Sequence, residues 1–185
     1  MMDWLRRLLS PSSVPTPGAI PRAPSDMLGS ATLPVATGDK GRLKARGQRN
    51  NNWGNIDYHE ANQWAGQRGI EPPPFNGGRA RFAVFVSPEY SVRAILKLLD
   101  NYQRKYDIRT IRGMIDRWAP PNENNTDQYV SFVAGRVGVL PDVAINLADK
   151  GIAARLVKAI VQKELGYLPD NADTVIAAGI RLAKL

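Results

Sequence analysis

Proline is the feature that most limits where this chain can fold, because six prolines fall between Ser10 and Leu43. Each proline removes a backbone donor, and the residues between them supply too few large apolar groups to form a core alone. We therefore expect residues 1–47 to form an extended arm and residues 48–185 to form one folded domain. The prolines are Pro11, Pro15, Pro17, Pro21, Pro24 and Pro34.

Positive charge is concentrated in and beside this arm. The net charge of the chain is +8, and residues 1–49 contain eight Lys and Arg against three Asp, which places +5 of that charge there. Such a segment suits nucleic acid, an anionic membrane face or an acidic protein surface, and a solvated tail that only aids solubility is an equal alternative. Nucleic acid is the weaker hypothesis, because no aromatic residues alternate with the basic residues of 40–49. Docking on other proteins is favoured by four apolar residues at helical spacing, Trp4, Leu5, Leu8 and Leu9.

The cysteine and histidine content limits the chemistry that this chain can perform. There is no cysteine, and His59 is the single histidine, so a zinc-thiolate centre, a thiol nucleophile or a multi-histidine metal site is not expected. We expect no metal and no cofactor, and any catalysis would depend on carboxylates. No segment approaches the roughly 20 apolar residues of a membrane span, and no signal-peptide pattern follows the first residues.

Helical spacing of apolar residues dominates the second half of the sequence. Three stripes at intervals of three and four residues predict three helices, and two further helices are expected over about 150–165 and 171–182. Alternation around Phe82, Val84 and Val86 predicts one short strand or hairpin, and a short helix is expected over Tyr58–Gly69. The fold class is therefore mainly α. The stripes are Val92, Ile95, Leu96, Leu99 and Tyr102; Ile111, Met114, Ile115 and Trp118; and Tyr129, Val130, Val133, Ala134 and Val137.

An asparagine-rich segment, Gln48–Ile56, stands at the start of the domain. Three consecutive asparagines followed by Trp, Gly and Asn disfavour helix and strand, because asparagine side chains compete for their own backbone and glycine visits positive φ. A structured loop that presents amides suits polar, uncharged ligands such as sugars. The alternative is that the cluster only forms turns.

Glu164 is the candidate for acid chemistry. On a helical wheel of residues 150–165 it falls near the middle of the stripe formed by Leu156, Val157, Ile160 and Val161. A carboxylate that points to the core favours its neutral form, as a general acid requires. The alternative is that Glu164 leaves the core at the helix end and reaches water or an arginine, and the pattern alone favours this reading.

Three segments resemble a group of small phage structural proteins. They are Arg49–Ile56, Arg81–Phe85 with Ser87-Pro88-Glu89, and Arg117–Thr126 with Tyr129. The order of these elements is also similar to glucosaminidase-type and lysozyme-like murein hydrolases. Those enzymes carry their acidic glutamate before the asparagine loop, so a permuted lysozyme-like domain would reconcile the two patterns. In the phage group the loop usually contains proline where this chain has Trp53, and the late motif His-Glu-Asn-Gly is here Lys163-Glu164-Leu165-Gly166.

The resemblance implies a virion protein that carries a peptidoglycan-degrading domain, which cleaves β-1,4 glycosidic bonds during genome entry. Its partners would be peptidoglycan and, through residues 1–47, other virion proteins, and the particle would assemble in the host cytoplasm. The alternative is an inactive hydrolase-like domain with only a structural role in the particle. By the same resemblance the acid is Glu164, and the substrate-binding residues are Asn51, Asn52, Gly54, Asn55 and Tyr129.

Overall fold

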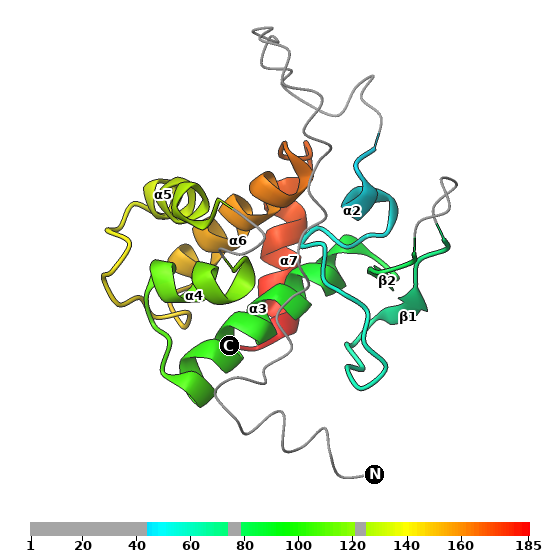
Figure 1. The fold of residues 1–185 in the computed structure, drawn as a ribbon, viewed down its shortest axis with the longest axis horizontal. Helices are drawn as coiled ribbons and strands as arrows, with labels where there is room; N and C mark the ends of the chain where they lie inside the picture. The colour runs from blue at the N-terminus through cyan, green and yellow to red at the C-terminus, as the bar shows by residue number, and fades with distance from the viewer. Residues whose placement is uncertain (1–43, 74–78, 121–124) are drawn as a thin grey trace, which may run out of the picture.

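The computed structural model describes residues 44–73, 79–120 and 125–185, and Figure 1 shows their arrangement. The expected mainly helical fold with one small sheet is confirmed: the described residues form six helices and a two-stranded antiparallel sheet. Nearly all of the proline-rich arm, including the apolar residues at its start, lies outside the described residues. The elements are α2 (Arg46–Arg49), β1 (Gln67–Ile70), β2 (Ala83–Phe85), α3 (Pro88–Tyr106), α4 (Ile111–Trp118), α5 (Thr126–Val137), α6 (Lys150–Leu165) and α7 (Ala172–Ala183).

The helices begin and end at local signals in the sequence. The side chains of Thr110, Asn125 and Asp149 each accept a hydrogen bond from a backbone N–H in the first turn of α4, α5 and α6. Gly138 and Gly166 end α5 and α6 in the left-handed conformation, with φ of 80° and 76°. These caps fix the length of α6 and therefore place Glu164 in its last turn.

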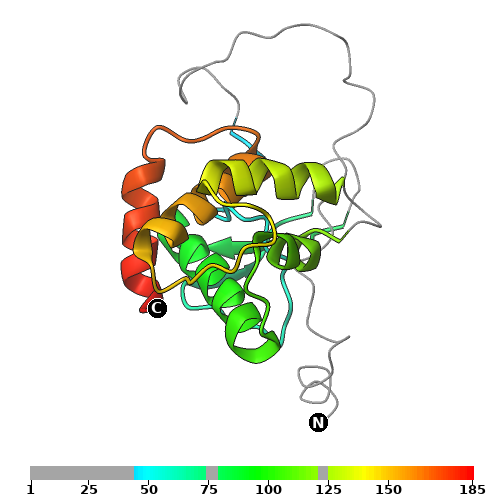
Figure 2. The same cartoon turned by 90° about the vertical axis from the view of Figure 1, so that its left-hand side faces the viewer.

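The long helix α3 lies at the centre of the helical layer, with α7 packed along one side of it (Figure 2). Gly179 of α7 makes this approach close, because a Cβ atom there would lie 2.3 Å from Cγ1 of Val92. α5 packs against both α4 and α6 and completes the core around residues of α3 such as Ile95 and Leu99, which are fully buried. Within the described ranges, no helix combines the length and the apolar character that a membrane crossing requires.

The small sheet replaces the helix that we expected over Tyr58–Gly69, and that prediction was wrong. The segment contains turns and then strand β1, in which Ile70 pairs with Ala83 of β2. Gly66 and Gly69 adopt φ of 76° and 138°, which a helix does not allow. A Cβ atom on Gly66 would also lie 2.3 Å from the ring of Tyr90, so the chain turns there against the start of α3.

Candidate functional site

The carboxylate of Glu164 lies where the asparagine-rich loop meets helices α4 and α5. Its Oε1 accepts hydrogen bonds from Nε1 of Trp118, at 3.0 Å, and from the hydroxyl of Tyr129, at 2.9 Å. Its Oε2 accepts one from Nδ2 of Asn55, at 3.1 Å, and the same Nδ2 lies 3.2 Å from the Glu164 carbonyl. The residue as a whole is half-buried. The side chain therefore points inward, whereas the sequence pattern alone favoured a glutamate that leaves the core at the helix end.

Burial sets the protonation of this acid. Desolvation raises the pKa of Glu164 above its ordinary value, and the three hydrogen bonds and the charge of Lys163 offset this rise only in part. Burial and the nearby Glu164 carboxylate also raise the pKa of Tyr129 well above its usual value. Tyr129 therefore stays a neutral hydrogen-bond donor, while Glu164 holds its proton to a higher pH than an exposed glutamic acid does.

The loop reaches Glu164 through unusual backbone conformations. Asn51 and Asn55 adopt φ of 50° and 45°, in the left-handed region that asparagine tolerates better than most residues. Between them, Gly54 lies so close to α3 and α4 that a Cβ atom would approach Ile95 to 2.8 Å and Trp118 to 3.3 Å. Glycine at this position lets the loop pack beneath Trp118, and this packing brings the Asn55 amide to the carboxylate.

The other predicted loop residues bind the protein's own backbone. Nδ2 of Asn51 donates to the carbonyl oxygens of Phe85 and Val86. Asn52 is fully buried; its Nδ2 donates to the carbonyls of Ile56 and Ala83, and its Oδ1 accepts from the N–H of Ile56. Of the predicted set, the structure brings Asn55 and Tyr129 to Glu164, while Asn51, Asn52 and Gly54 shape the loop that carries Asn55.

Sequence reasoning missed a second buried acid, Glu71, which is surrounded by hydrogen-bond donors. This side chain is only 5% exposed and accepts hydrogen bonds from Nε and Nη2 of Arg46, from Nδ2 of Asn50 and from the N–H groups of Arg81 and Phe82. Burial acts to raise the pKa of Glu71, but these donors outweigh it and lower the pKa to about 2. Glu71 is therefore ionised, and its hydrogen bonds connect α2 and the asparagine loop to the residues beside the sheet.

Trp118 was also missed as a partner of Glu164, because its position in the apolar stripe of α4 indicated a core residue. It is a core residue, only 1% exposed, yet its indole Nε1 donates to the acid. A buried tryptophan usually finds an acceptor for this N–H group. The signal in the sequence was thus the combination of a buried indole with an inward-facing glutamate on another helix.

The fold and the site define a small helical domain in which one acid, held between a loop and two neighbouring helices, has a raised pKa. No protein-family model matches the sequence. The chain is 33% identical over 150 residues to Protein P5 of Pseudoalteromonas phage PM2, a match that covers 80% of this chain and 86% of P5. The chain therefore belongs to the family of phage proteins that includes P5.

Proposed function

We propose that this protein is a component of a phage virion and that its folded part cleaves β-1,4 glycosidic bonds of peptidoglycan, with Glu164 as the general acid. The similarity to P5 of phage PM2 supports the phage origin of the family. The observation that carries the enzymatic part is the half-buried Glu164 carboxyl with its raised pKa. A glycosidase needs such an acid to protonate the oxygen of the leaving sugar.

In the proposed reaction Glu164 transfers its proton to the glycosidic oxygen as the bond from that oxygen to the anomeric carbon breaks. The leaving sugar keeps the bonding electron pair and the proton. The carbonyl oxygen of the substrate's own N-acetyl group attacks the anomeric carbon in place of a second protein carboxylate, and water that gives a proton to the Glu164 carboxylate then opens the resulting oxazolinium ring. Alternatively, the 6-hydroxyl attacks the anomeric carbon and gives its own proton to the Glu164 carboxylate. This choice fits the described residues, since the three side chains that hydrogen bond the Glu164 carboxylate are a tryptophan, a tyrosine and an asparagine.

The partners of Glu164 then have distinct roles in this proposal. Trp118 and Tyr129 bind the same oxygen, Oε1, and fix the plane of the carboxyl group. Asn55 binds the other oxygen, which is left with a single side-chain donor and is the better candidate to face the sugar. Asn51, Asn52 and Gly54 act through the loop, because they hold Asn55 in place.

Cleavage of purified murein sacculi by the Glu164→Gln variant tests the proposal. Glutamine keeps an oxygen that accepts from Trp118 and Tyr129, so the fold should be retained while the transferable proton is lost. Glu60→Gln is the matched control, because Glu60 is an exposed acid in a turn. We expect sacculi to be solubilised by the wild type and by Glu60→Gln and not by Glu164→Gln. Equal solubilisation by folded Glu164→Gln would refute the assignment.

A second function, purely structural, is favoured by one observation: both oxygens of the Glu164 carboxylate already have hydrogen-bond donors within the protein. In this case the domain is an inactive hydrolase-like part of the particle, attached to other virion proteins by residues 1–47. The wild-type protein should then leave sacculi intact, and Glu164→Gln should leave infectivity unchanged. Deletion of the arm should abolish incorporation of the protein into particles.

A further inference from the structure

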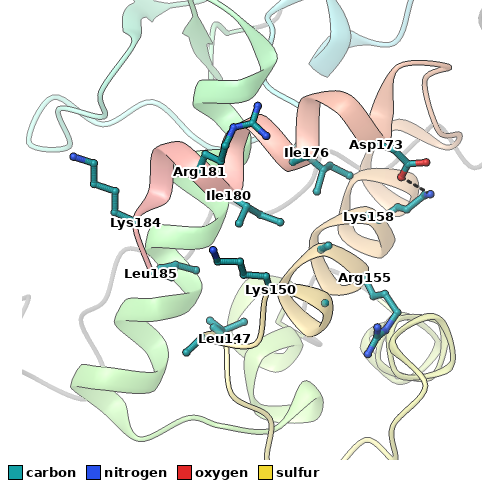
Figure 3. Close-up of a pocket in the computed structure, with 14 residues that line it drawn as sticks. Leu147, Lys150, Arg155, Lys158, Asp173, Ile176, Ile180, Arg181, Lys184 and Leu185 are labelled. Atoms are coloured by element: carbon teal, nitrogen blue, oxygen red, sulfur yellow. Dashed lines mark hydrogen bonds and ion pairs between the residues drawn. The ribbon is translucent and has the colours of Figure 1, made fainter.

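A cavity of about 630 Å³ opens between the first half of α6 and the facing side of α7 (Figure 3). It is at the opposite end of α6 from Glu164, because its lining includes Lys150 and Gly151 in the first turn while Glu164 occupies the last. The proposed hydrolase chemistry therefore does not use this cavity. Its size is in the range of sites that bind a ligand or a few side chains of a partner.

The floor of the cavity is apolar and recessed. Leu147 and Ile176 are each only 2% exposed, and the partly buried Ile180 lies between them in Figure 3. A ligand must therefore project apolar groups into the cavity to gain the burial that the floor offers.

The rim of the cavity is basic on both sides. Figure 3 shows Lys150 on the α6 side, pointing towards the end of α7, and Lys184 at the end of α7. Arg181 points to the other side of α7, and Arg155 turns towards α5, where its Nε donates to the Val137 carbonyl at 2.9 Å. Lys158 is already paired with Asp173 at 2.6 Å, and Asp173 is the acidic side chain among the described lining residues. No ion pair within the described ranges involves Lys150, Arg181 or Lys184.

We propose that this groove, lined by Leu147, Ile176 and Ile180 and flanked by Lys150 and Lys184, binds an acidic, amphipathic segment of another protein. Aliphatic side chains of the segment enter the cavity, and Asp or Glu residues beside them meet the cations on the two rims. The inference does not depend on the role of Glu164.

Charge and shape select this occupant over the others. The arm of this chain is itself basic, with seven Lys and Arg against three Asp over residues 1–47 and so a net +4, and it is repelled by the rim. A nucleic-acid backbone would satisfy the cations but would leave the apolar floor without a partner, and a membrane could fill the floor only if an acyl chain left the bilayer. Only a convex ligand with both acidic and aliphatic groups matches both features of the groove.

The test is a titration of the full-length, ¹⁵N-labelled chain with a synthetic helical peptide, followed by NMR. The probe carries leucine at positions i, i+3, i+4 and i+7 and glutamate elsewhere over about four helical turns. Controls are a scrambled peptide of the same composition and vesicles of phosphatidylglycerol. We expect saturable shifts of the amides of Gly151, Ala177 and Lys184 with the patterned peptide, and none at Asn55.

Two charge-reversal variants locate the binding. Lys150→Glu should weaken peptide binding about tenfold, and because an acid is favoured in the first turn of a helix, this variant should fold. Lys105→Glu makes the same change of charge at an exposed position at the end of α3 and should bind as the wild type does. Absence of saturable shifts, equal binding of the scrambled peptide, or equal effects of the two variants would overturn the proposal. Stronger effects of vesicles than of the peptide would also overturn it.

Discussion

The indole N–H of Trp118 donates a 3.0 Å hydrogen bond to the carboxylate of Glu164, which is 46 residues away in the sequence. The hydroxyl of Tyr129 donates to the same oxygen at 2.9 Å. Three helices, α4, α5 and α6, thus meet at one carboxyl group, and the asparagine loop completes the contact through Asn55. The orientation of this acid is fixed by the core itself, so substitutions of its partners should change its pKa in a defined direction.

Replacing Tyr129 with phenylalanine should raise the pKa of Glu164 further. The Tyr129 hydroxyl favours the charged carboxylate, and its loss leaves the effect of burial less opposed. If Glu164 is the general acid, the fall in sacculus cleavage at high pH should therefore move to higher pH in Tyr129→Phe. A profile that keeps its position, in a variant that still folds, would mean that another group donates the proton.

Replacing Glu164 with glutamine should also change how stability depends on pH. A raised pKa in the folded state means that the neutral acid favours folding below its ordinary pKa, and that this stability is lost as pH rises through the folded-state value. The free energy of unfolding of the wild type should fall over that interval, whereas that of Glu164→Gln should stay flatter. Urea unfolding followed by circular dichroism at a series of pH values measures the difference, and parallel curves would contradict it.

Glu71 and its donors predict the opposite dependence of stability on pH. Its pKa is lowered from 4.5 to about 2, so its stabilising effect is present above pH 4.5 and is lost as pH falls towards 2. Glu71→Gln should lower the free energy of unfolding at neutral pH by about 3 kcal/mol, the value that corresponds to this shift in pKa. It should also flatten the dependence on pH between those values. Asp107→Asn, in an exposed pair with Arg109, is the control and should change stability little.

The close packing of α3 and α7 predicts that substitution of Gly179 strongly destabilises the protein. Alanine there would place Cβ 2.3 Å from Val92 Cγ1 and 3.0 Å from the Glu89 carbonyl, and overpacking of this kind costs about 1–3 kcal/mol. Gly135, in α5, is a matched control, because a Cβ atom there meets nothing within 4 Å. Gly135→Ala should stabilise the protein by about 0.5–1 kcal/mol, since alanine favours helix more than glycine does. Equal changes in the midpoint of thermal unfolding for Gly179→Ala and Gly135→Ala would show that the contact between α3 and α7 adjusts to the added methyl group.

Local signals explain why the helices could be predicted from the sequence. Asp149 and Gly166 mark the two ends of α6 by their own chemistry, and the apolar spacing between them shows which face is buried. The same pattern placed Glu164 near the buried stripe, but its position in the last turn favoured exposure, and the contacts with Trp118 and Tyr129 decide for the inward direction. The error over Tyr58–Gly69 arose because a few apolar residues at helical spacing were given more weight than Gly66 and Gly69, which disfavour a helix.

Long-range contacts explain what the sequence did not reveal. Glu71 is followed by three prolines and looked like part of a loop, and its main partner, Arg46, is 25 residues away. The amides of Asn51 and Asn52 looked available for a ligand, because their acceptors are backbone carbonyls of a strand more than thirty residues later. Such partners become visible only when the fold brings the segments together.

The most direct test of the account is the titration of the Glu164 carboxyl carbon by NMR, in protein that contains ¹³C-labelled glutamate. The Glu164→Gln variant assigns the resonance. We predict a midpoint above the ordinary value of 4.5, and a further rise in Tyr129→Phe. A midpoint at or below 4.5 would contradict the claim that the core holds this acid ready to donate a proton.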